Sequence, residues 1–393
     1  MSLCTRANAV SGGLRAAPLG ALASKRDKST ALGTRGDRLE ALRKGTGGRS
    51  SFNGVVATVF GASGFLGRYV MNALGKCGTM LVVPYRSDFY DVQRLKVCGD
   101  LGQIVFHPFN LKDEKSIAKA MQYSNVVINL IGKDVATRNF THKDVHVDGA
   151  RRIARLARES GVEKLIHISA LNATEKPKRV CFVSSKFYAS KWEGEHAVRE
   201  EFPEAVILRP SDMYGQEDRF LRYYAAAYRR TLDSLPLWNK GEGIYKTPVF
   251  VGDVAKAIVN AIMSRNCSGE IYQAVGPKTY QLGDLVDYIF KLLRRDDGYL
   301  RYEMRYNPLF LARVLVCEKL FKVFPTLNFE RLEREHTTDM IDIDLKTIAE
   351  LGVKLTEVEQ RFPYDLKYFR ASHYYDGDMM RFEHIKPPPP VVL

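Results

Sequence analysis

The sequence predicts an α/β fold in which helices cover both faces of a parallel sheet, with a smaller lobe at the C-terminal end. Two observations support this prediction. Between residues 55 and 208, short apolar segments alternate with helical segments, which is the pattern of successive βαβ units. A glycine-rich segment also follows the first apolar segment directly. Because crossovers between parallel strands are almost always right-handed, we expect a doubly wound sheet.

The expected strands are short runs of β-branched and other apolar residues, as buried parallel strands are. They fall at 55–60, 80–84, 103–106, 125–131, 164–169 and 205–208. Helical spacing predicts the connecting helices. The first follows the glycine segment and ends at about residue 74, and the others span 112–121, 149–160 and 187–201. Beyond Pro210 the pattern weakens, and we expect helices at 252–264 and 282–293 and a strand at 269–274.

The glycine segment predicts a Rossmann-type dinucleotide site, because it joins a strand to a helix. Gly61 permits a tight turn, Gly64 lets the backbone approach the pyrophosphate, and Gly67 lets the helix pack close to the sheet. The free N–H groups of the helix N-terminus favour phosphate. The predicted cofactor-binding residues are those of the whole loop, Gly61, Ala62, Ser63, Gly64, Phe65, Leu66 and Gly67.

The residue after the second strand indicates which dinucleotide is bound. An acid at this point binds the ribose 2′-hydroxyl of NAD, whereas an arginine accommodates the 2′-phosphate of NADP. Here Arg86 follows the strand, and its planar guanidinium suits a phosphate. We therefore expect NADPH. Asp88, two residues further on, leaves NADH open as the alternative.

Composition and spacing divide the chain into three parts. The first fifty residues hold ten Lys or Arg and three acids, none before Asp27. An arginine-rich, acid-poor leader is typical of a mitochondrial transit peptide, and a basic tail or a nucleic-acid arm is the alternative. We expect a transit peptide and linker over 1–45, with a flexible glycine-rich linker at 45–51. The NAD(P)-binding domain is expected over 52–276, with 211–250 contributing partly to the second lobe, and the C-terminal lobe and proline-rich tail over 277–393.

Several classes of protein are not expected. No apolar run reaches the length of about 18 residues that a membrane-spanning helix needs. The six cysteines show neither C-x-x-C nor zinc-ligand spacing, so we expect no metal and no disulfide framework. No nucleic-acid partner is expected, since aromatic–basic RNA platforms are absent from the sequence pattern.

Residues 299–329 mix basic and apolar side chains. This mixture favours contact with a membrane surface or a partner subunit, and packing on the lobe's own core is the alternative.

The G-x-x-G-x-x-G spacing of the loop resembles the extended and atypical branches of the short-chain dehydrogenase/reductase family. This resemblance implies further cofactor contacts at the ends of the later strands. Asn110 and Leu111 correspond to the adenine contact, and Leu130, Ile131 and Gly132 to the adenosine ribose. Ser169 corresponds to the catalytic serine of relatives, and Arg209 and Pro210 to residues beside the nicotinamide.

The proton donor of active relatives has no counterpart in the expected position. They use Tyr-x-x-x-Lys, in which the tyrosine exchanges a proton and the lysine holds the ribose. Lys191 matches the lysine and is a predicted cofactor ligand, but Phe187 stands four residues before it. Tyr188 is rotated by about 100° around the helix. We therefore assign no catalytic residue, with Tyr188, or Ser169 acting through a water, as the alternative.

The chain also resembles the nucleotide-binding accessory subunits of mitochondrial NADH:ubiquinone oxidoreductase (complex I). The segments that carry this resemblance are 48–51, 55–70, 124–132, 161–164, 202–205 and 215–221. It implies a non-catalytic, NADPH-binding subunit on the matrix side of the inner membrane, with other complex I subunits as partners. Such a subunit would be needed for assembly or stability of the peripheral arm, near the membrane and the quinone-reducing region. The members of that family carry tyrosine where this chain has Phe187. A free mitochondrial NADPH-dependent reductase or epimerase and a sensor of the NADPH ratio are the alternatives.

Overall fold

The main sheet is parallel throughout and, within the described residues, contains eight strands. The computed structural model describes residues 35–137, 139–226, 228–230, 234–264, 266–295, 298–320, 327–371 and 385–391. The strand order is β14-β11-β6-β5-β4-β1-β2-β3, which confirms the predicted doubly wound topology. The strands are β1 (Val56–Phe60), β2 (Met80–Tyr85), β3 (Ile104–Pro108), β4 (Val126–Asn129), β5 (Lys164–Ile168), β6 (Val206–Pro210), β11 (Ile271–Ala274) and β14 (Lys346–Thr347).

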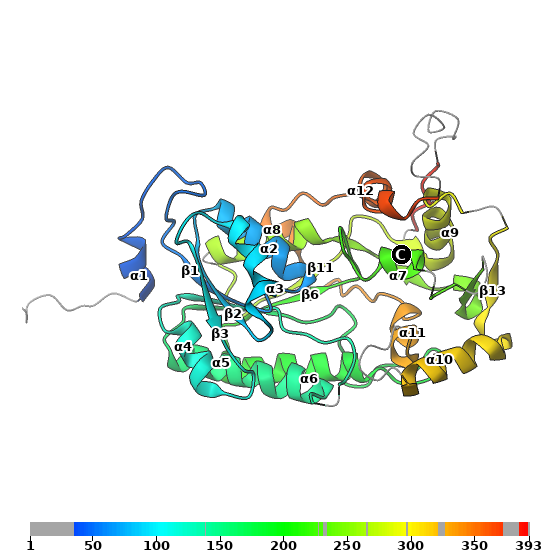
Figure 1. The fold of residues 1–393 in the computed structure, drawn as a ribbon, viewed down its shortest axis with the longest axis horizontal. Helices are drawn as coiled ribbons and strands as arrows, with labels where there is room; N and C mark the ends of the chain where they lie inside the picture. The colour runs from blue at the N-terminus through cyan, green and yellow to red at the C-terminus, as the bar shows by residue number, and fades with distance from the viewer. Residues whose placement is uncertain are drawn as a thin grey trace, which may run out of the picture.

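Helices cover the two faces of the sheet in separate groups (Figure 1). One face carries α2 (Phe65–Lys76), α3 (Phe89–Gln93) and α8 (Val251–Met263), and the other carries α4 (Glu114–Met121), α5 (Gly149–Glu159) and α6 (Lys186–Glu201). Successive strand residues point to opposite faces, so Val59 joins the α2 and α8 core, whereas Phe60 joins the α4, α5 and α6 core. A π-helical turn (Asp144–Asp148) precedes α5.

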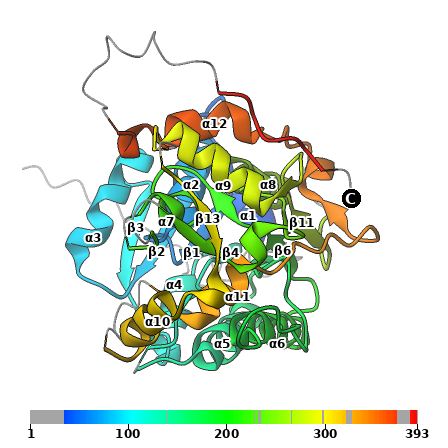
Figure 2. The ribbon, with the colours of Figure 1, turned by 90° about the vertical axis from the view of Figure 1, so that its right-hand side faces the viewer.

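A second lobe, facing the viewer in Figure 2, lies beside the carboxyl edge of the sheet and has its own core. Fully buried Tyr214, Tyr224, Phe290 and Phe362 belong to that core. Its helices are α7 (Leu221–Ala225), α9 (Leu282–Leu292), α10 (Pro308–Leu320), α11 (Phe329–Glu335) and α12 (Val358–Asp365). Its short strands are β7 (Met213–Tyr214), β8 (Leu235–Leu237), β9 (Tyr245–Lys246), β10 (Val249–Phe250), β12 (Tyr280–Gln281) and β13 (Arg301–Glu303). Short 3-10 helices lie at Arg94–Cys98, Trp238–Gly241, Met304–Tyr306, Ile348–Leu351 and Lys367–Phe369.

The boundary predicted at residue 277 is wrong for one returning segment. β14 pairs in parallel with β11 at the end of the main sheet, and the Ile348 and Val353 side chains are buried in the sheet core. A two-residue strand has no periodicity that a sequence pattern could reveal. The described part of the proline-rich tail, 385–391, returns to the second lobe, where the Val391 N–H donates to the Thr279 carbonyl at 2.8 Å.

The N-terminal part is folded from residue 35 onward, which differs from the predicted start of order after the linker. α1 (Arg35–Glu40) contacts the Rossmann domain, since the Arg35 guanidinium donates to the Ser124 carbonyl at 2.8 Å. Lys44 and Phe52 form an antiparallel bridge that closes 45–51 into a turn, so the prediction of a flexible linker there is wrong. Residues 1–34 of the predicted transit peptide lie outside the described residues.

No helix in the described part of the chain is long and apolar enough to cross a membrane.

Candidate dinucleotide site

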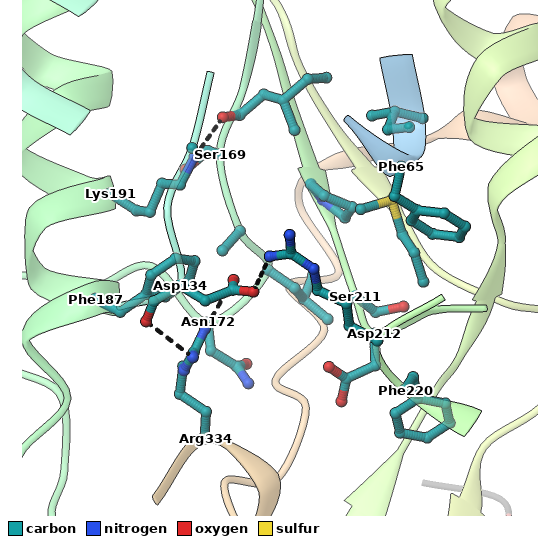
Figure 3. Close-up of a pocket in the computed structure, with 18 of the residues that line it drawn as sticks. Phe65, Asp134, Ser169, Asn172, Phe187, Lys191, Ser211, Asp212, Phe220 and Arg334 are labelled. Atoms are coloured by element: carbon teal, nitrogen blue, oxygen red, sulfur yellow. Dashed lines mark hydrogen bonds and ion pairs between the residues drawn. The ribbon is translucent and has the colours of Figure 1, made fainter. Parts of the chain in front are cut away.

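A cavity of about 330 Å³ lies between the glycine loop, the carboxyl ends of the central strands and the second lobe. Figure 3 shows Phe187 and Lys191 projecting into it from α6, with Phe65 and Phe220 on the opposite side. Ten of the predicted cofactor-binding residues line it: Gly61, Gly64, Phe65, Leu66, Gly67, Leu130, Gly132, Ser169, Lys191 and Pro210. The fold thus brings together residues that lie up to 149 positions apart in the chain.

The glycine loop has the geometry of a phosphate cradle. Gly61 has a φ of +82°, a conformation that glycine adopts readily. A Cβ on Gly67 would lie 2.5 Å from the Gly61 carbonyl oxygen, and one on Gly64 would lie 3.2 Å from the same atom. The absence of both side chains lets α2 begin directly against the loop, and the first N–H groups of a helix have no partner within it. The loop therefore fits the pyrophosphate of a dinucleotide.

The remaining predicted residues lie outside the cavity lining: Ala62, Ser63, Arg86, Asn110, Leu111, Ile131 and Arg209. Arg209 differs most from its expected place beside the nicotinamide, because its guanidinium binds the Glu195 carboxylate of α6 at 2.6 Å. Strand residues alternate between faces, so Pro210 reaches the cavity and Arg209 does not. The Leu111 side chain is buried in the core under Gly149. Asn110 is exposed, and its side-chain oxygen accepts from the Lys112 N–H at 3.0 Å.

Lys191 lines the cavity beside the end of β5. Its ammonium donates to the Ile168 carbonyl at 2.9 Å and would lie 3.3 Å from a Cβ on Gly132. Burial lowers the pKa of Lys191 to about 8, because a low-dielectric site disfavours the charged form. A ribose hydroxyl beside Gly132 is therefore within reach of this lysine.

Phe187 places a hydrocarbon ring in the cavity wall. The Arg334 guanidinium lies 4.4 Å above the ring centroid and the Lys191 ammonium 5.9 Å from it. The His146 ring packs edge-on, with centroids 5.3 Å apart. Phe187 therefore contributes packing and cation–π contacts, and has no group that can exchange a proton.

Two groups that could take over proton transfer also line the cavity. The Ser169 hydroxyl is buried and has no hydrogen-bond partner in the structure, which fits a group that meets a ligand. Tyr188 is buried on another side of α6, and burial raises the pKa of its phenol. Buried Lys246, whose ammonium binds the Asp212 carboxylate at 2.9 Å, acts electrostatically on this phenol.

Sequence reasoning missed the charged end of the cavity. It is lined by Asp134, Asp212, Arg219, Arg331, Arg334, Glu335 and Asp339. These residues come from segments separated by up to 205 positions and share no motif. Only the folded chain brings them together, so no local signal could have revealed them.

Arg86 lies on the exposed surface beyond the β2 end rather than in the cavity. Its guanidinium lies 5.7 Å from the Phe140 ring centroid, and the Lys112 ammonium lies 4.9 Å from the same ring. Two cations thus gather on one aromatic ring of this surface. This arrangement provides a positive field for an additional phosphate.

Comparison with known proteins identifies the family. Residues 57–274 match the NAD dependent epimerase/dehydratase family. The chain belongs to this family. Subunit 9 of the NADH dehydrogenase [ubiquinone] 1 alpha subcomplex from Mus musculus is 44% identical over 87% of each chain. The NADH-ubiquinone oxidoreductase 40 kDa subunit of Neurospora crassa is 36% identical over 84% of each chain. The chain is thus a relative of mitochondrial complex I subunits, which confirms the resemblance seen in the sequence.

Solved structures agree on the fold. A UDP-glucose 4-epimerase from Thermotoga maritima, determined with UDP-glucose, has a TM-score of 0.57 and 15% identity, covering 80% of this chain and 98% of its own. MoeE5, determined with UDP-glucose and NAD, has a TM-score of 0.58 and 13% identity over similar shares. At these identities the likeness supports the fold alone.

Proposed function

We propose that the chain is a non-catalytic, NADPH-binding accessory subunit of mitochondrial complex I. In this proposal, the bound dinucleotide stabilises the fold, and the subunit supports the peripheral arm on the matrix side of the inner membrane. The observation that carries the proposal is a cavity that keeps the glycine cradle and Lys191 but has Phe187 in place of the proton donor. In this proposal, the site keeps the residues that bind the dinucleotide and lacks the residue that active relatives use for proton transfer.

A tightly held ligand stabilises the native state, because it binds the folded chain and not the unfolded one. The cavity contacts both the Rossmann domain, through Gly61 and Lys191, and the second lobe, through Arg334. A dinucleotide bound there would join the two parts of the molecule. This is a function for the cofactor that needs no hydride transfer.

The surface of α10 supports attachment to a larger assembly. Phe310 and Val314 are buried in the lobe core, whereas Leu309 is 80% exposed, and Leu315 and Val316 are also exposed. Arg313, on the same helix, is exposed too. An apolar surface with basic side chains suits the anionic membrane surface or a partner subunit. We propose that α10 makes the peripheral contact with the inner membrane.

Arg86 is expected to determine the preference for NADPH. Replacing it with glutamine removes a charge-assisted hydrogen bond worth about 1.5–3 kcal/mol, so the Kd for NADPH should rise about ten- to a hundredfold. The Kd for NADH should not change. Isothermal titration with both dinucleotides checks this, with Arg94→Gln on the neighbouring exposed surface as the control. An equal loss for both dinucleotides would contradict a role in 2′-phosphate recognition.

Phe187→Tyr is expected to restore the missing acid. The wild-type chain should oxidise NADPH no faster than buffer in the presence of carbonyl compounds, since Phe187, which stands where active relatives have the tyrosine, cannot exchange a proton. A positioned general acid contributes about 10²–10⁴-fold, so the variant should exceed the wild type by at least the lower value. NADPH absorbance follows the reaction, and Phe109→Tyr, beside Phe60 and outside the cavity lining, is the matched control. Wild-type turnover as fast as that of the variant would favour a reductase.

Native electrophoresis of mitochondrial membranes tests the assembly role. The chain is expected to migrate with complex I and to be absent from the free matrix fraction. Depleting it should reduce the assembled complex. If the protein is found only as a free monomer in the matrix, the proposed function is wrong, and a free reductase or a sensor becomes the better explanation.

A further inference from the structure

Three arginines converge at one end of the cavity. Arg331 and Arg334 lie three residues apart on α11, which places them on one face of that helix, and Arg219 comes from the segment between β7 and α7. An Arg331 guanidinium N–H donates to the Arg219 carbonyl at 2.6 Å. The Arg331 guanidinium also lies 4.0 Å from the Tyr223 ring centroid. We refer to these three residues as the arginine cluster.

Asp134 meets the arginine cluster from the Rossmann side. Its carboxylate pairs with Arg219 and, at 3.5 Å, with Arg334, and the Arg334 guanidinium also donates to the Asp134 carbonyl at 3.2 Å. Figure 3 shows Arg334 reaching from α11 toward Asp134. Burial alone would raise the pKa of Asp134, but Arg334 and Arg219 hold it well below its ordinary value. The carboxylate is therefore ionised at neutral pH.

The loop that carries Asp134 is fixed to the Rossmann domain by a buried histidine. The Lys133 N–H donates to His146 Nε2 at 3.1 Å, and His146 Nδ1 lies 2.8 Å from the Ser190 hydroxyl of α6. Burial lowers the pKa of His146 to about 2, so the ring is neutral and Nε2 is available as an acceptor. The segment that carries Asp134 is thus linked through His146 to α6.

Two acidic residues of α11 attach the same helix to the first turn of α6 and to the segment before it. The Glu330 carboxylate accepts from the Phe187 N–H at 2.7 Å. The Glu333 carboxylate accepts from the Cys181 and Phe182 N–H groups at 2.9 and 2.8 Å. Glu330 therefore ties α11 to the first turn of α6, next to Arg334, whose guanidinium lies over the Phe187 ring, and Glu333 ties it to the segment that leads into α6.

We propose that Asp134 and the arginine cluster form a latch that closes the second lobe over the cavity and slows release of the dinucleotide. This inference rests on the proposed function. Asp134 follows Gly132 and Lys133, which line the same cavity as Gly61, so the ion pairs bridge the walls between which the ligand is held. Release then requires breaking charge pairs that are partly shielded from water, with Asp134 31% and Arg334 14% exposed.

Release of NADPH from the full-length chain measures the latch. The loaded protein is mixed with excess NADP⁺, and the loss of NADPH fluorescence gives the dissociation rate constant. Asp134→Asn keeps the shape of the side chain but removes its charge, and it should accelerate release by about tenfold or more, the equivalent of one charge-assisted contact. Glu114→Gln, which disrupts a surface pair with Arg155 outside the cavity lining, should release at the wild-type rate.

Further variants separate the latch from a general loss of stability. Arg219 is 69% exposed, so Arg219→Gln should fold normally and still accelerate release. The Asp134→Asn/Arg219→Gln double variant should release no faster than Asp134→Asn, because the shared pair is already broken. Asp134→Glu should recover part of the slow release.

The outcomes also distinguish the latch from the proposed function. A wild-type chain that does not bind NADPH would overturn the proposed function itself. A wild-type chain that binds NADPH and releases it no more slowly than Asp134→Asn would overturn the latch alone. Fully multiplicative effects of Asp134→Asn and Arg219→Gln would likewise show that the two residues do not act together.

Discussion

Replacing Glu335 with glutamine is expected to destabilise the chain by about 3–5 kcal/mol, the cost of leaving a buried charge without its partner. Glu335 pairs at 2.9 Å with Arg229, whose side chain is completely buried in the second lobe. Arg229 has one further acceptor, the Pro236 carbonyl at 2.8 Å. Removing the negative charge leaves the guanidinium in an apolar core between the Tyr223 and Phe310 rings.

Denaturant unfolding of the ligand-free chain measures this effect, with Glu357→Gln at a half-exposed surface pair as the control. The double variant Arg229→Met/Glu335→Leu should recover most of the loss, because an apolar pair of similar volume needs no charge compensation. A loss below about 1 kcal/mol, the range of surface pairs, would contradict a dry core around Arg229.

The same pair predicts a pH dependence. Burial alone would raise the pKa of the Glu335 carboxyl, but Arg229 brings it below its ordinary value. A depressed pKa in the folded state contributes stability above the unfolded pKa, and that contribution is lost as the pH falls through the folded pKa. The wild-type chain should therefore lose stability on acidification below the ordinary glutamate range more steeply than Glu335→Gln.

Gly67→Ala is expected to weaken dinucleotide binding strongly. The added Cβ would lie 2.5 Å from the Gly61 carbonyl oxygen and 2.6 Å from that of Ala62. Both are backbone atoms, so the loop and α2 must separate, at a cost of about 1–3 kcal/mol in overpacking. Because that separation also displaces the N–H groups that face the pyrophosphate, the Kd for NADPH should rise by at least about a hundredfold, or 2.7 kcal/mol.

Gly48→Ala is the matched control for Gly67→Ala, since a Cβ there meets nothing within 4 Å. Titration with NADPH and thermal unfolding should both leave this control at the wild-type values. If Gly67→Ala bound NADPH as tightly as the control, the pyrophosphate would not lie on this loop, and the proposed cofactor site would be wrong.

Local signals predicted the elements of the main sheet well. Val55 to Phe60 and Met80 to Pro84 are β-branched or apolar runs flanked by turns, and β1 and β2 begin within one residue of the predicted starts. The short strands of the second lobe and β14 were missed, because two or three residues carry no periodicity. Their pairing depends on contacts between distant segments.

The candidate site likewise contains residues that local sequence patterns predicted and residues that they could not predict. Gly61, Gly67 and Lys191 follow from spacing within one loop or one helix turn, and the structure places them in one cavity. The expected position of Arg209 was wrong because adjacent strand residues face opposite ways, and Glu195 draws its guanidinium to α6. Arg334 lies 200 residues from Asp134 and could be assigned to the site only after folding.

The nucleotide content of the assembled complex tests the central claim most directly. Complex I containing this chain is isolated on a native gel, the chain is released by denaturation, and the freed nucleotides are identified and counted by mass spectrometry. The account predicts one NADPH for each copy of the chain, retained without oxidation when quinone is added. A chain that carries no dinucleotide, or that carries NADH in place of NADPH, would contradict it.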